Sequence, residues 1–140
     1  MESKIKQIAE EMGLGYLYCS WYEANDRLDD MESFPVMVNI LPTSGRLNLN
    51  MDEFRDNPNC IFAFFDRLGV NEEQASTTSE RMKELMKRFI VKMNESRGFY
   101  YIDGDIDYSI AYDKMDARLV GVILSVSVKE LNGQSTCDYD

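Results

Sequence analysis

The sequence predicts an α+β fold, in which a mainly antiparallel sheet of four to six strands carries an N-terminal helix and one long helix. Strand patterns are grouped before and after the long helical pattern, whereas in a parallel α/β fold they would alternate with helices. The long helical pattern repeats apolar residues at steps of three and four, which is typical of a helix with one buried face. Residues 108–131 alternate around a polar turn, which indicates a closing C-terminal β-hairpin.

The first half of the chain contains the shorter helix and most of the predicted strands. Residues 4–12 have apolar side chains at helical spacing and lead into Gly13 and Gly15, which is typical of a helix end. Residues 23–33 are polar and acidic, and we expect a loop there. Asn57-Pro58-Asn59 is expected to interrupt the chain just before a central strand that is buried on both faces. The predicted strands are residues 16–22, 34–40, 47–51 and 60–65.

The second half contains the long helix and the hairpin. Asn71 and Thr78 are both candidate N-caps, and Gly98 is expected to end the helix before a short aromatic strand at 99–102. The buried stripe of the helix is predicted to be Met82, Leu85, Met86, Phe89, Ile90 and Met93. In the last strand we expect one buried face, made by Val120, Val122, Leu124, Val126 and Val128, and one wetter face, made by Ser125, Ser127 and Lys129.

Length and composition predict one folded domain. The chain has 140 residues, of which 44% are apolar, and we expect a single domain over 1–131 followed by a flexible acidic tail over 132–140. The longest apolar run, residues 60–65, is far shorter than the roughly 20 residues of a membrane helix. The start of the chain lacks the apolar segment of a secretory signal. We therefore expect no membrane partner and synthesis in the cytoplasm.

The charge balance excludes a DNA-gripping surface as the main function. The formal net charge is −10 and the pI is about 4.5. Binding to duplex DNA depends on clustered Lys and Arg that release counterions from phosphates. An acidic surface is instead compatible with DNA that passes by without specific binding.

Most catalytic arrangements are missing from the sequence. The chain has no histidine, which excludes Ser-His-Asp and Cys-His nucleophile activation, and no Gly-rich phosphate loop is present. The three cysteines, Cys19, Cys60 and Cys137, are too widely spaced to indicate a zinc site or a disulfide framework. A hydrolase that uses two carboxylates ranks last, because many such pairs can be drawn from 25 acidic residues. We therefore expect a non-enzymatic protein without a cofactor.

One acidic cluster is a weak candidate for metal binding. Asp103, Asp105 and Asp107 alternate as at the start of a calcium loop. Such a loop requires Gly at its sixth position and Glu at its twelfth, but Tyr108 and Lys114 occupy these positions. An acidic turn leading into the hairpin is the preferred interpretation, and no metal site is predicted.

Three features resemble the tail terminator and neck (head-tail joining) proteins of tailed bacteriophages. The first is the opening helix, residues 5–12, that leads into a strand, and the second is the strand 60–65 followed by a helix at 82–93. The third is Tyr112-Asp-Lys followed by Val120-Gly-Val-Ile-Leu-Ser-Val-Ser-Val-Lys-Glu130, which resembles the last strand of tail-associated proteins in phages and prophages of Bacteroides-like bacteria. The element order is similar over most of the chain.

The resemblance implies a structural virion protein that is assembled in the bacterial host cytoplasm. It implies a homo-oligomeric ring, of six or twelve copies, that caps the tail tube and joins it to the head while DNA passes through. The implied partners are further copies of the chain, the tail tube and neck or connector proteins. A ring needs unlike faces, and the acidic Asp29 and Asp30 are expected to meet the basic Lys87, Arg88 and Lys92 of a neighbour. The alternative is a small protein-interaction module or regulator that acts through the aromatic strand at 16–22.

Overall fold

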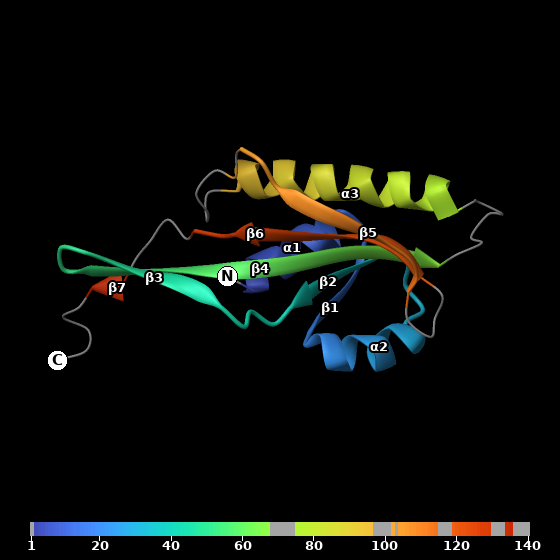
Figure 1. Ribbon diagram of the computed structural model, residues 1–140, viewed down its shortest axis with the longest axis horizontal. Helices are drawn as coiled ribbons and strands as arrows, with labels where there is room; N and C mark the ends of the chain where they lie inside the picture. The colour runs from blue at the N-terminus through green and yellow to red at the C-terminus, as the bar shows by residue number, and fades with distance from the viewer. Residues whose placement is uncertain are drawn as a thin grey trace.

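The computed structural model describes residues 2–67, 75–96, 102, 104–114, 119–129 and 134–135 (Figure 1). The predicted α+β fold, with a mainly antiparallel sheet, an N-terminal helix and one long helix, is confirmed. The elements in chain order are α1 (Glu2–Glu11), β1 (Gly15–Cys19), α2 (Trp21–Asp29), β2 (Val36–Ile40), β3 (Gly45–Asn50), β4 (Glu53–Arg67), α3 (Ala75–Glu95), β5 (Asp107–Lys114), β6 (Leu119–Ser127) and β7 (Gln134–Ser135).

The sheet is built around β4, a strand of 15 residues. The strand order is β1-β2-β4-β6-β5, and β3 and β7 pair with the first part of β4. Strands β1 and β2 are parallel, whereas the other described pairs are antiparallel. Because β4 is longer than its neighbours in the main sheet, its first part extends beyond them with β3 and forms a projecting hairpin (Figure 1).

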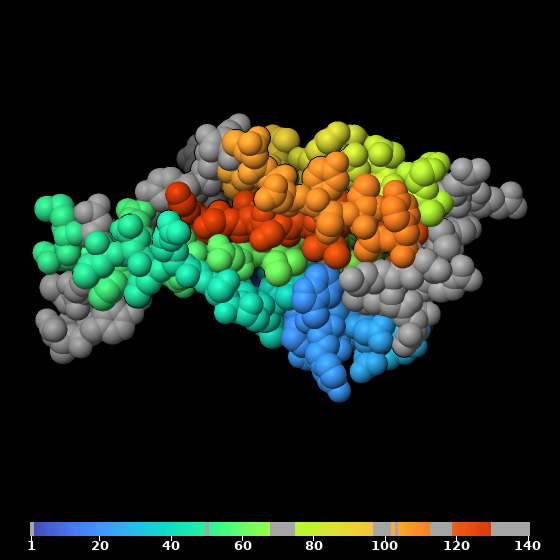
Figure 2. All heavy atoms as spheres, viewed as in Figure 1, coloured from blue at the N-terminus to red at the C-terminus, as the bar shows by residue number. Residues whose placement is uncertain are grey.

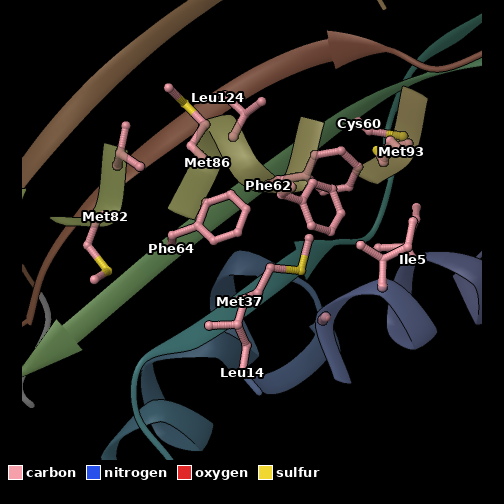
Figure 3. Close-up of a cluster of buried hydrophobic side chains, with 14 of the residues drawn as sticks. Ile5, Leu14, Met37, Cys60, Phe62, Phe64, Met82, Met86, Met93 and Leu124 are labelled. Atoms are coloured by element: carbon pink, nitrogen blue, oxygen red, sulfur yellow. The ribbon is translucent and has the colours of Figure 1, made fainter. Parts of the chain in front are cut away.

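Each face of the sheet is covered by helices, which confirms that the strand predicted at 60–65 is central and buried on both faces. Strand alternation directs Phe62 and Phe64 towards α1 and α3, and Ala63 and Phe65 towards α2. Figure 1 shows α3 and α2 on opposite sides of the sheet. Figure 3 shows the larger core, in which side chains of α1 and α3 meet those of β4 and β6.

The long helix contains the predicted stripe. Met82, Met86, Phe89 and Met93 are buried, and Leu85 and Ile90 pack against the same cluster. The predicted cap at Thr78 is wrong, because Thr78 lies inside α3 and is fully buried. Asn71 and Gly98, like residues 99–101 of the predicted aromatic strand, lie outside the described residues.

The acidic stretch 23–33 was predicted to be a loop, but its first part is helical. The aromatic strand ends at Cys19, and Ser20 caps α2 by accepting a hydrogen bond from the backbone N–H of Glu23 at 3.3 Å. Ala24 and Leu28, four residues apart, then bury one side of the helix. The acidic residues Glu23, Asp26 and Asp29 occupy the solvent side of an amphipathic helix and do not indicate a loop.

The predicted interruption at Asn57-Pro58-Asn59 is also wrong, because β4 continues through it. Pro58 lies one residue before the first β4–β6 pair, Asn59 with Ser127, and its carbonyl accepts a hydrogen bond from the Val128 N–H at 3.1 Å. A proline is tolerated at such a ladder end, where its missing N–H breaks no strand pairing.

The closing hairpin is formed by β5 and β6. Val120, Val122, Leu124 and Val128 are buried as predicted, and Ser125 and Ser127 are exposed. The other face of β6 is exposed only towards the end of the strand, because Leu119 and Ile123 pack in the core cluster that contains Ala24 and Leu28 of α2. Of the tail predicted over 132–140, Gln134–Ser135 pair with β4, and the rest lies outside the described residues. No described helix is both long and apolar enough to span a membrane.

Candidate functional site

A groove between α1 and α3 is the candidate functional site. It has a volume of about 510 Å³ and is lined by Glu11, Met12, Lys87, Arg88, Val91, Lys92 and Glu95. A neighbouring hollow of about 290 Å³ shares Glu11, Lys92 and Glu95 and continues along α1. The groove exists because both helices direct their apolar sides towards the sheet, so their outer polar sides leave a channel between them. All three cations predicted at the interface, Lys87, Arg88 and Lys92, line it.

The groove combines three cations and the two carboxylates of Glu11 and Glu95 with exposed apolar surface. Val91 and Lys92 lie three and four residues after Arg88, so all three side chains share one side of α3. Val91 is 54% exposed. Lys87 forms an ion pair with Glu84 at 3.0 Å, whereas Arg88 and Lys92 have no ion-pair partner within the part of the chain that the structure describes. A ligand that pairs with Arg88 and Lys92 needs carboxylates placed away from Glu11 and Glu95, and an apolar strip beside Val91.

Side-chain contacts near both ends of α3 fix its position. Near its start, Arg81 donates to the buried carboxylate of Asp66 at 2.9 Å. Near its end, the side-chain amide of Asn94 donates to the carbonyl of Ile102 at 2.9 Å and accepts from the N–H of Ile102 at 2.7 Å. Between these two ends, the buried methionines of α3 pack in the core with side chains of β4 and β6 (Figure 3). The cations of the groove therefore lie on a rigid element.

The acidic residues of the predicted interface lie on the other side of the molecule. Asp29 ends α2 and Asp30 follows it, and both side chains are exposed. The sheet separates α2 from α3, as Figure 1 shows. The structure therefore does not bring Asp29 and Asp30 near Lys87, Arg88 and Lys92 within one chain. A contact between the two groups requires a second copy.

The projecting hairpin is a feature that sequence reasoning missed. We call residues 45–58, which comprise β3 and the first part of β4, the arm. On it, Leu47, Leu49 and Met51 are 65%, 58% and 92% exposed. Figure 2 shows the arm extending from the body at the left of the molecule. The alternation of Leu47, Leu49 and Met51 predicted a half-exposed strand, but the sequence does not reveal that none of the described helices covers its apolar face.

The weak metal candidates do not form a site in the described part of the chain. Asp105 and Asp107 are exposed, and Asp107 begins β5, whereas Asp103 lies outside the described residues. Among the described residues there is no cluster of three or more His, Cys, Asp or Glu side chains that would hold an ion.

The aromatic stretch and the cysteines are divided among different environments. Tyr18 is on β1 and 38% exposed, and Tyr22 is on α2 and 89% exposed, so the residues 16–22 do not form one strand. Cys19 and Cys60 are buried free thiols, and burial raises the pKa of Cys60 to about 11. A thiol with so high a pKa is a poor nucleophile at neutral pH. Cys137 lies outside the described residues.

Comparison of the chain with protein-family models, with curated proteins and with solved structures gives no match.

Proposed function

We propose that the protein is a structural virion protein of a tailed phage, a ring-forming tail terminator or neck component that caps the tail tube and joins it to the head. The sequence resemblance supports this proposal, and so does a fold in which an N-terminal helix and a long helix pack on a mainly antiparallel sheet. The role needs no cofactor and no catalytic group, because the protein acts through its surfaces.

The observation that carries the proposal is that the chain has unlike surfaces on opposite sides. One side has the basic groove with Arg88 and Lys92, and the other has the acidic end of α2 with Asp29 and Asp30. Copies that join through two different surfaces form a ring when the rotation closes. Attraction between opposite charges helps to orient such a contact. An acidic protein with a net charge of −10 also suits a channel through which DNA slides.

The alternative proposal is an interaction module that binds another protein through aromatic residues. It is favoured by the exposure of Tyr18 and Tyr22 on neighbouring elements. Exposed tyrosines are common in protein interfaces. This function would leave the groove without a role, whereas ring formation uses it.

Binding to tail tubes tests the proposed function. The purified protein is mixed with assembled phage tail tubes and sedimented, and the pellet is imaged by negative staining. We expect the protein to sediment with the tubes and to form a cap at one tube end. If it stays in the supernatant with tubes from every candidate phage and forms no ring by itself, the proposal is wrong. The Tyr22→Ala variant distinguishes the two proposals. If the protein caps tail tubes through its groove, tube binding should not depend on Tyr22.

A further inference from the structure

The arm has an apolar face. This face continues the face of the main sheet that α1 and α3 cover. Alternation along β4 places Phe54 and Asp56 on the same side as Phe62 and Phe64, which face α1 and α3. Leu49 pairs with Phe54 and Leu47 with Asp56, and directly paired residues share a face. The sheet face that α1 and α3 cover in the body therefore extends along the arm, where Leu47 and Leu49 are exposed.

We infer that the arm of one copy lies in the α1–α3 groove of the next copy. This inference rests on the proposed function, since it supplies the contact between copies in the ring. In the body, the two helices bury this face of the sheet. In the assembly, the outer side of the same two helices in a neighbouring copy would cover the arm. Every copy would therefore insert its arm into one neighbour and provide a groove for the other.

The chemistry of the two surfaces matches. The groove offers Val91 and Met12 as apolar surface, and the arm offers Leu47 and Leu49. The carboxylate of Asp56 lies beside Leu47 on the apolar face and has no ion-pair partner among the described residues. This carboxylate would meet Arg88 or Lys92 of the groove, and neither of these cations has an ion-pair partner among the described residues. Apolar contact with flanking opposite charges gives both affinity and register.

The arm fits the groove better than the acidic end of α2 does. Asp29 and Asp30 supply charge, but the apolar residue next to them, Leu28, is buried in its own chain. Exposed charges alone contribute little to a contact at physiological salt. The acids of α2 are therefore expected to affect the rate of association, and the arm is expected to determine its strength.

Cross-linking between two variants tests the inference. Both variants carry Cys137→Ser, and Cys19 and Cys60 are buried. Leu49→Cys in an enlarged, tagged copy is mixed with Val91→Cys in an untagged copy and treated with a short bismaleimide. We expect a covalent species with the summed mass of the two copies. In the matched control, Tyr22→Cys replaces Val91→Cys, because Tyr22 is 89% exposed but lies on the opposite side of the sheet. Cross-linking no stronger than in this control overturns the inference.

A pair of substitutions that add the same charge gives a second test. Leu49→Asp is on the apolar face and Asn48→Asp on the other face of the arm, and both positions are exposed. Loss of a buried leucine contact should weaken assembly about tenfold or more for Leu49→Asp, and Asn48→Asp should change it less than about threefold. Equal effects of the two variants contradict the inference. Thermal unfolding of each variant checks that the fold is intact.

The outcomes separate this inference from the proposed function. Rings that form while Leu49→Cys and Val91→Cys fail to cross-link contradict the arm contact and leave the proposed function standing. A specific cross-link in a protein that never forms a closed ring, alone or with tail tubes, supports the arm contact and contradicts the proposed function.

Discussion

The ring of Phe89 on α3 lies edge-on against the ring of Phe62 on β4, with centroids 5.4 Å apart and an angle of 61° between the planes. Phe64 makes a similar contact with Phe89 at 5.5 Å. Edge-to-face pairs of this kind add to the stabilisation that comes from burial alone. Because Phe89 lies between Arg88 and Val91 in the sequence of α3, these contacts set the position of the groove.

Phe89→Ala is therefore expected to lower the free energy of unfolding by about 3–5 kcal/mol, because it removes a fully buried ring and leaves a cavity. Chemical denaturation followed by circular dichroism measures this. Val91→Ala on the same helix is the control, since Val91 is 54% exposed and its loss should cost less than about 1 kcal/mol. Similar losses in both variants would contradict the packing described for α3.

Gly121→Ala is expected to destabilise the protein by about 1–3 kcal/mol or more, because β6 approaches β4 closely at this point. A Cβ atom at Gly121 would lie 2.2 Å from the Phe64 carbonyl oxygen and 2.4 Å from Cδ1 of Phe65. Differential scanning calorimetry checks the expected fall in Tm. The control is Ser127→Ala in the exposed end of β6, which should leave the Tm nearly unchanged.

Much of the fold could be predicted because it depends on local periodicity. The helical stripe from Met82 to Met93 predicts the buried side of α3, and the alternation around Leu124 predicts the buried side of β6. Both predictions were confirmed. The helix at Trp21–Asp29 was missed because its fully buried residues are only Ala24 and Leu28, and the aromatic residues at its start suggested a strand. Pro58 was taken as a break because the ladder end that tolerates it depends on β6, which is distant in sequence.

The candidate site could be predicted only in part. The cations Lys87, Arg88 and Lys92 were found from the charge pattern of α3, but their groove also needs α1, and a helix pattern does not reveal its neighbours. The exposed arm was missed for a related reason. The alternation of Leu47 and Leu49 predicts one apolar face, and only the tertiary structure shows that α1 and α3 stop short of it.

A buried polar network predicts a loss of stability at high pH. The hydroxyl of Tyr16 donates to Glu2 at 2.9 Å and accepts from the side-chain amide of buried Asn39 at 3.2 Å. Burial raises the pKa of Tyr16 well above its ordinary value of about 10. The unfolded chain therefore loses this proton first, so stability is constant below about pH 10 and falls as the pH rises further.

Tyr16→Phe should remove this part of the pH dependence, and it should cost about 1–3 kcal/mol at pH 7 because Asn39 loses an acceptor. Denaturation curves between pH 7 and about 11 measure both effects. Tyr22→Phe is the control, since Tyr22 is 89% exposed. An unchanged slope in the Tyr16→Phe variant would contradict the network.

Charge reversal in the groove should weaken the association of copies. Lys87→Glu with Arg88→Glu replaces two cations of the groove by anions, which then repel the acidic partner surface. The control is Lys6→Glu with Lys129→Glu, which changes the net charge equally at exposed positions that do not line the groove. Sedimentation velocity at low salt compares the two variants. Unchanged assembly of the groove variant would remove the groove from the interface.

The central claim is that copies of this chain join through unlike surfaces into a closed ring. Negative-stain imaging of the unmodified protein, alone and after incubation with tail tubes, tests it most directly. We expect rings of uniform size, of six or twelve copies as the resemblance implies, free in solution or at tube ends. A protein that remains monomeric or dimeric at every concentration and in the presence of tail tubes would contradict the account.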